Sequence, residues 1–246
     1  MAKPSYKAII LVLASDNNEA YRRFRKIYHA YYESNPEILV LMVYGKSPNL
    51  VPNDHDLVYD DIEENYYPGM ITKTIRAIEH IESTYDYEYL VRTNLSTFWV
   101  LDRLLGRLNK APAQECFEGS IRFCSVRGGT SSPNYISGIN LILSRDMVRL
   151  MLTKKQDMLS WNLKAEDWAL SQSLTDLGYT PKAVVPAAIH HMDIFDHMSE
   201  RVPKEIDAAD RMGRDHFRIK NKGDRAELDI AIANMLLLRY YGKTIL

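Results

Sequence analysis

The chain has 246 residues and a formal net charge of −1, which leaves no basic excess for a nucleic-acid partner or a polybasic membrane surface. Hydrophobic residues make up 46% and charged residues 26%, the proportions of an ordinary soluble globular protein. These values exclude disordered, collagen-like and disulfide-scaffold classes.

The first apolar run, Ala8–Ala14, is bounded by turn residues and predicts a strand buried on both faces. A short signal peptide is the alternative, because Lys3 and Lys7 flank the run, but Ser15 to Asn18 offers no clear cleavage site. No run approaches 18 apolar residues, so we expect no membrane anchor.

Two cysteines in a chain of this size, Cys116 and Cys124, favour a reducing compartment, and we expect a cytoplasmic protein. One disulfide between them is the alternative. Their spacing is not that of a Cys-x-x-Cys pair, so a structural zinc site is not expected.

Strand-like runs then alternate with segments of helical periodicity. The expected strands are 8–14, 38–44, 56–59, 87–92, 116–126, 139–144 and 183–189. The expected helices are 18–33, 70–84, 98–108, one from Arg145, 166–177 and 226–240, with a loop over 126–134.

This alternation predicts an α/β fold whose mixed, mostly parallel sheet is flanked by helices. We expect one domain over 1–246, with 197–246 as a helical C-terminal extension and the charged stretch Arg201–Arg225 as solvated surface.

Ligands of such sheets bind at the carboxyl ends of strands, which selects the loops after Ala14, Tyr59, Arg92 and Ile189. The Gly45-Lys46-Ser47 sequence lacks the earlier glycine of a P-loop, and no Gly-x-Gly-x-x-Gly follows the first strand. A P-loop enzyme and a dinucleotide-binding dehydrogenase are therefore not expected.

Four sets of polar residues lie at or next to the ends of predicted strands and helices, in positions that suit a functional site. Asn94 and Ser96 lie two residues apart after a strand, so an extended backbone points both the same way. The other groups are 135–140, Glu166-Asp167 at a helix start, and His190-His191 at a strand end. An acid pair at a helix start is more commonly a cap, and adjacent histidines are more commonly structural.

Taken in order, these motifs resemble the fringe and β1,3-glycosyltransferase group of GT-A glycosyltransferases over about residues 8–195. The residues that carry the resemblance are Tyr66, Lys73-Thr74, Tyr89, Arg92-Thr93, Thr97-Phe98, Ser137-Gly138, Leu143-Ser144-Arg145 and Glu166-Asp167. The stretch 92–96 also resembles glycosyltransferase-like proteins of large DNA viruses such as chloroviruses, which work in the cytosol of the host.

The resemblance implies a GT-A, Rossmann-like nucleotide-sugar-binding fold that transfers a sugar from a UDP-sugar to a hydroxyl of an acceptor glycan with inversion. Asp167 matches the position of the base, with Glu166 as the fallback. Donor binding is assigned to Ser15, Asp16, Lys73, Arg92, Asn94 and Ser96, and the sugar or acceptor pocket to Tyr66, Tyr135, Ser137, Gly138, Asn140 and Trp168.

The chain departs from the family at Asn94-Leu95-Ser96, where an acidic Asp-x-Asp motif normally holds Mn²⁺ or Mg²⁺ on the diphosphate. In the preferred interpretation the metal is retained, with ligands among Asn94, Ser96, His190 and His191. In the other, cationic side chains replace it, with Lys73, Arg92, Arg122 and Arg127 as candidates.

Two other functions stay open at this point. The missing acids at Asn94 and Ser96 fit a non-catalytic module that binds UDP-sugar or glycan, and an α/β fold also fits another nucleotide-dependent enzyme such as a methyltransferase. The sequence specifies neither the oligomeric state nor the donor among xylose, glucose, galactose and N-acetylglucosamine, although a viral xylosyltransferase is one hypothesis.

Overall fold

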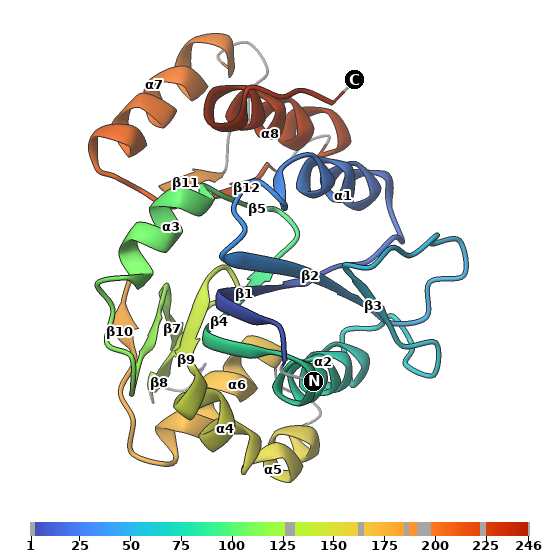
Figure 1. Ribbon diagram of the computed structural model, residues 1–246, viewed down its shortest axis with the longest axis vertical. Coiled ribbons are helices and arrows are strands. Elements are labelled where there is room, and N and C mark those ends of the chain that lie inside the picture. Colours follow the sequence, from blue (N-terminus) through green and yellow to red (C-terminus); the bar gives the residue numbers. More distant parts are fainter. Residues whose placement is uncertain are drawn as a thin grey trace.

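A computed structural model describes residues 3–125, 131–161, 165–184, 187–190, 198–221 and 225–245. Its centre is a seven-stranded sheet in the order β10-β6-β9-β4-β1-β2-β3 (Figure 1). The strands are β1 (Ser5–Leu13), β2 (Ile38–Tyr44), β3 (Asp56–Val58), β4 (Asp86–Asn94), β6 (Phe117–Gly119), β9 (Leu141–Ser144) and β10 (Lys182–Ala183). Only β9 runs antiparallel to its neighbours, β4 and β6, so the predicted mixed, mostly parallel sheet is confirmed.

Helices cover both faces of this sheet, as Figure 1 shows. On one face lie α2 (Gly69–Thr84), α4 (Arg145–Leu152), α5 (Lys155–Ser160) and α6 (Glu166–Thr175). On the other lie α1 (Glu19–Tyr31) and α3 (Leu101–Leu108), and α7 (Met198–Arg211) and α8 (Arg225–Tyr241) lie beyond them.

Strand β1 explains why a continuous apolar run is needed at the centre of a covered sheet. Ala8, Ile10 and Val12 pack into the core under α1, α3 and α8, whereas Ile9 and Leu11 pack into the core under α2 and α4. Because successive side chains of a strand point to opposite faces, both faces must be apolar. Each fully buried aliphatic side chain contributes roughly 1.5–3 kcal/mol to folding.

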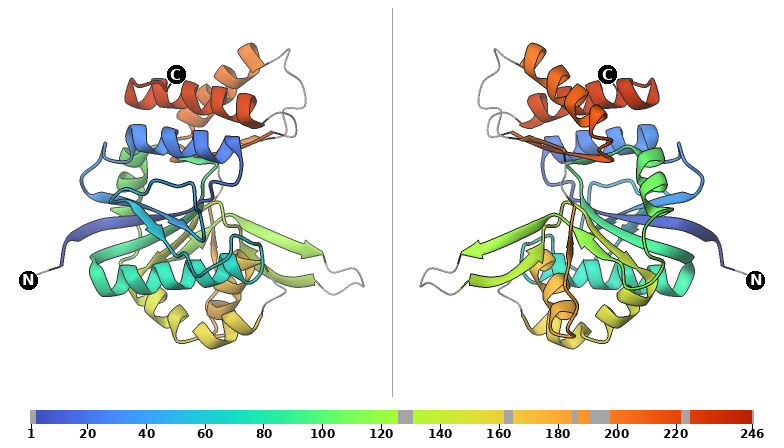
Figure 2. Two further views of the ribbon diagram at one scale, coloured as in Figure 1. Left: turned by 90° about the vertical axis from the view of Figure 1, so that its right-hand side faces the viewer. Right: turned by 90° about the vertical axis from the view of Figure 1, so that its left-hand side faces the viewer.

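The C-terminal segment joins the body through a second, three-stranded sheet. Its strands are β5 (Thr97–Trp99), β11 (Ala187–His190) and β12 (His216–Lys220), with β12 antiparallel to β5 and parallel to β11. Helix α8 packs along α1, which both views of Figure 2 show. The C-terminal residues are therefore brought next to Ser96, directly before β5.

Several predicted boundaries are wrong, and non-local pairing explains them. The expected helix 98–108 begins only at Leu101, because Thr97–Trp99 pairs with β12. Part of the expected loop 126–134 belongs to β8 (Ser131–Ile136), which pairs with β7 (Ile121–Ser125) in a hairpin that projects from the body (Figure 2). The expected strand 183–189 is divided between β10 and β11.

Two details of the C-terminal segment need correction: the helical extension over 197–246 also contains the strand β12, and part of the stretch Arg201–Arg225 is buried rather than solvated. Helix α7 buries Val202 and Ile206, and β12 is a strand that buries Phe217 and Ile219. Among the described residues, no helix combines the length and the apolar character needed to cross a membrane.

Candidate functional site

A cavity of about 340 Å³ opens where β1 and β4 end, at the carboxyl edge of the parallel strands. It brings together residues that are far apart in the sequence. Six predicted donor-site or sugar-site residues line it, namely Ser15, Tyr66, Lys73, Arg92, Asn94 and Ser96. Both residues of the acid pair, Glu166 and Asp167, line the same cavity.

Arg92, near the end of β4, is held by hydrogen bonds to three residues. Its Nε and Nη2 donate to the two carboxylate oxygens of Glu166, with Nε–Oε1 at 3.0 Å. Its Nη1 donates to Asn94 Oδ1 at 3.0 Å and to the Gly138 carbonyl. The side chains of Arg92 and Glu166 are only 3% and 1% exposed, so this is a buried ion pair. Burial raises the pKa of Glu166, and the Arg92 charge opposes that rise.

Lys73 forms a second ion pair, buried on the lysine side, at the wall formed by α2. Its Nζ donates to Glu64 Oε1 at 2.5 Å and to the Ala14 carbonyl at 2.8 Å, which ties α2 to the end of β1. Burial lowers the pKa of Lys73, and the Glu64 charge opposes that effect. Sequence reasoning missed Glu64, because it lies in an irregular segment with no periodic or motif signal.

Asp167 lies in the first turn of α6 and is partly exposed, unlike Glu166. Its Oδ2 accepts from the Gly138 N–H at 2.7 Å and its Oδ1 from the Trp168 N–H at 2.9 Å. Tyr66, which is 56% exposed, lines the same cavity as this carboxylate. Burial raises the pKa of Tyr66, and the negative charge of Asp167 adds to that rise. Asp167 is therefore the acid of the pair that an incoming hydroxyl can reach.

Gly138 supports both charged groups from one loop. Its carbonyl accepts from Arg92, while its N–H donates to Asp167. A Cβ atom added at Gly138 would lie 2.0 Å from Arg92 Nη1. The close approach of the loop to Arg92 therefore requires glycine here.

The structure adds three basic residues that sequence reasoning had placed on a solvated surface. Arg218 and Lys220 come from β12 and Arg225 from the start of α8, and all three line the cavity. Arg218 Nη1 donates to Ser96 Oγ at 2.5 Å. Burial lowers the pKa of Arg218 to about 10, and the neighbouring Arg225 charge adds to the effect. The alternation of Phe217 and Ile219 with these cations is a strand signal that could have revealed β12.

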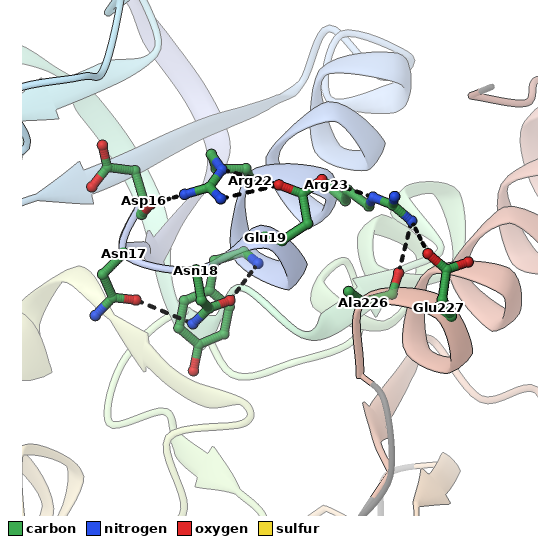
Figure 3. A network of polar contacts seen from close by, with 9 residues as sticks. Asp16, Asn17, Asn18, Glu19, Arg22, Arg23, Ala226 and Glu227 are labelled. Carbon is green, nitrogen blue, oxygen red and sulfur yellow. Dashed lines mark hydrogen bonds and ion pairs between the residues drawn. The ribbon is translucent and has the colours of Figure 1, made fainter.

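The remaining predicted residues lie beside the cavity or behind its wall. Asp16 is partly exposed, and its carbonyl accepts from Arg22 Nη1 at 2.8 Å (Figure 3). Asn140 is fully buried, where its Oδ1 accepts from the Ser120 N–H at 2.8 Å. The others, Tyr135, Ser137, Gly138 and Trp168, are not among the residues that line the cavity, and Trp168 packs edge-on against Trp161 with ring centroids 5.3 Å apart.

The donor set at this edge does not fit a hard divalent cation, as judged from the described residues. Asn94 Oδ1 already accepts from Arg92 and Ser96 Oγ from Arg218, so two guanidinium groups occupy the neutral oxygens that would have to bind the ion. The part of the chain that the structure describes contains no group of three His, Cys, Asp or Glu side chains arranged to hold a metal.

Four other residues proposed for the metal or its replacement are not tested by this geometry. His190 ends β11 opposite Lys220 of β12, whereas His191 lies outside the described residues. Arg127 also lies outside them, and Arg122 is placed in β7 by its backbone.

A mixed, mostly parallel sheet between two helical layers, with a polar cavity at the carboxyl edge of β1 and β4, agrees with the GT-A fold that the sequence resemblance implies. An active-site mutant of LgtC has this fold, with a TM-score of 0.50, 12% sequence identity, and coverage of 92% of this chain and 95% of that chain. This similarity establishes the fold.

Two further solved structures match with lower TM-scores. The galactosyltransferase LgtC in complex with donor and acceptor sugar analogs gives 0.49 at 13% identity, covering 92% of this chain and 95% of that one. A glycosyltransferase involved in glycosylation of the major capsid of PBCV-1 gives 0.48 at 10% identity, covering 92% and 98%. No protein-family model and no curated protein matches the sequence, so the fringe-like subgroup stays a prediction.

Proposed function

We propose that the protein is a glycosyltransferase that moves a sugar from a UDP-sugar to a hydroxyl of an acceptor glycan, with inversion at the anomeric carbon. The observation that carries the proposal is that Asn94 and Asp167 line one cavity of a GT-A fold. A donor diphosphate and a proton-accepting carboxylate would therefore act on the same anomeric carbon.

In the proposed reaction Asp167 is the general base. The acceptor oxygen forms a bond to the anomeric carbon while the bond from that carbon to the diphosphate oxygen breaks. The hydroxyl proton passes to Asp167, and UDP leaves with the bonding electrons. Two backbone N–H groups hold the carboxylate, at 2.7 and 2.9 Å, and each oxygen keeps acceptor capacity for the proton.

We expect Glu166 to have a role other than that of the fallback base. Both of its oxygens accept from Arg92 and its side chain is only 1% exposed, so it is less accessible to a hydroxyl than Asp167. We propose that Glu166 positions Arg92, which in turn holds the Asn94 side chain and the Gly138 loop.

We propose that the donor lies with its uridine near Ser15 and Asp16, after β1, and its diphosphate near Asn94 and Ser96. Ser15 lines the cavity and Asp16 follows it directly. Tyr66 is an exposed aromatic ring at the cavity and provides a surface on which a sugar ring can stack. Xylose, from the resemblance to viral enzymes, is the first donor sugar to test.

The test is UDP release from a panel of UDP-sugars, with and without glycan acceptors, by the purified chain. We expect release with one donor and a loss of about 10²–10⁴-fold in kcat for Asp167→Asn, the range of general-base contributions. Asp157→Asn, an exposed acid on α5, is the matched control and should keep full activity. Unchanged kcat in Asp167→Asn would show that the base is another group.

A non-catalytic module that binds UDP-sugar is the second candidate, because the neutral Asn94 and Ser96 replace the acids of the related enzymes. Calorimetry separates the two. Saturable UDP-sugar binding without turnover across donors and acceptors would favour the module. Binding of S-adenosylmethionine without any binding of UDP would indicate a methyltransferase instead.

A further inference from the structure

The cavity carries more positive charge than its role as a sugar pocket requires. Among the described residues, five basic and three acidic side chains line it, which gives this set a formal charge of +2. Two of the acids, Glu64 and Glu166, are already in ion pairs with Lys73 and Arg92. The remaining basic residues are Arg218, Lys220 and Arg225, which we name the C-terminal basic cluster. Arg225 is also paired with Asp229, which lies behind the cavity and does not line it.

Arg225 is held in position by a layer of polar contacts behind it. Its Nε donates to Asp229 Oδ2 at 2.7 Å, and the fully buried Asp229 also accepts from the backbone N–H and the side-chain Nδ2 of Asn221. Its guanidinium lies over the ring of Tyr21, 5.8 Å from the centroid. Within the described chain the buried Nη2 atom of Arg225 has no hydrogen-bond partner, so it keeps a donor for a ligand.

The start of α8 is itself fastened to α1. Arg23 Nη1 donates to the Ala226 carbonyl at 3.1 Å and to Glu227 Oε1 at 2.8 Å (Figure 3). This contact fixes the residue next to Arg225, so the guanidinium is placed before any ligand arrives. Preorganised donors bind an anion without a further ordering cost.

Arg218 places one end of the C-terminal basic cluster at Ser96, in the segment where related enzymes have their metal-binding acids. It donates to Ser96 Oγ, and the Ile219 N–H donates to the Ser96 carbonyl at 2.9 Å, so β12 is pinned against this residue. A divalent cation at this point would be repelled by the guanidinium groups that already occupy the two oxygens. A phosphate oxygen would instead be attracted by them.

We propose that the C-terminal basic cluster binds the donor diphosphate and replaces the divalent cation of related GT-A enzymes. The inference rests on the proposed function, since it names the groups that bind the diphosphate in that same cavity. It departs from our expectation of a retained metal, and it assigns the charge to residues other than those first considered as replacements.

The experiment measures the affinity of UDP and of uridine by calorimetry, in chelator and in Mn²⁺. We expect UDP to bind equally well, within about twofold, under both conditions. Lys220→Met and Arg225→Gln should each weaken UDP about tenfold or more, since hydrogen bonds to charged groups are worth that much. The same variants should change uridine affinity by less than about twofold, because uridine has no phosphate.

Matched controls come from exposed basic residues of α7, Lys204→Met and Arg211→Gln, which should leave both affinities unchanged. Lys220 is exposed, so Lys220→Met tests the cluster even if loss of Arg225 perturbs folding. UDP binding that needs Mn²⁺, or equal losses for UDP and uridine, would overturn the inference and leave the proposed function standing. Absence of binding by UDP and every UDP-sugar would overturn the proposed function as well.

Discussion

Gly138→Ala tests whether the loop that holds Asp167 and the buried Arg92–Glu166 pair are packed as tightly as the geometry indicates. The new Cβ would lie 2.0 Å from Nη1, 2.7 Å from Cζ and 3.0 Å from Nη2 of Arg92. Arg92 has no free direction in which to move, because Glu166, Asn94 and the Gly138 carbonyl hold it.

The size of the expected loss in the free energy of unfolding depends on how the clash is relieved, and there are two ways. If the loop shifts, the cost is that of overpacking, about 1–3 kcal/mol. If Arg92 is displaced, the buried pair is broken, and the cost rises to about 3–5 kcal/mol. We therefore expect the free energy of unfolding to fall by about 3 kcal/mol, which lowers Tm by roughly 6–12 °C in a chain of this size.

The assay is urea unfolding followed by fluorescence, with the midpoint and the slope fitted together. Gly106→Ala in α3 is the control, because a Cβ at Gly106 meets no atom within 4 Å. That substitution should stabilise the chain by about 0.5–1 kcal/mol, the helix preference of Ala over Gly. If Gly138→Ala were as stable as the unmodified chain, the close approach of the loop to Arg92 would be refuted.

Two further predictions concern buried charge and a buried thiol. Arg92→Met should cost about 3–5 kcal/mol by leaving Glu166 buried without its partner, and adding Glu166→Gln should recover much of that loss; additive costs in a urea double-mutant cycle would contradict the pairing. Burial raises the pKa of Cys116 to about 12 from 9.0, so the unfolded chain loses this proton first as pH rises. The contribution of this thiol to stability should therefore be intact below pH 9 and fall by about 1.4 kcal/mol per unit between pH 9 and 12. The part of that slope due to the thiol should vanish in Cys116→Ala, and a slope identical in both chains would refute it.

The sequence alone predicted the central sheet because its signals are local. Strand β2 begins and ends at Ile38 and Tyr44 as predicted, since the whole segment is apolar and a glycine follows it. Helix α1 also follows its periodic residues, with Phe24, Ile27 and Tyr31 buried on one face. Such patterns show which side chains of a segment are buried. They can therefore be recognised without knowing which other elements pack against that segment.

The elements that were missed depend on partners distant in the sequence. Trp99 was assigned to a helix, yet its strand exists because His216 pairs with it across more than a hundred residues. The sequence places Arg218 and Lys220 in a charged stretch that is typical of a surface. Only the pairing of β12 brings them beside Ser96. For the site, the sequence located the residues after β1 and β4, whereas no local pattern marked Glu64. The alternation over 216–220 indicates a strand but not that its cations lie beside Ser96.

The order in which the pocket is assembled follows from the position of β12 and α8 after the central sheet in the sequence. The seven-stranded sheet is complete once β10 has been made, and a nascent chain can begin to fold at that stage because folding proceeds during synthesis. The basic residues from 218 to 225 emerge from the ribosome afterwards. A truncated translation product would therefore contain every strand of the central sheet but lack the cationic wall of its pocket and the helix that packs along α1.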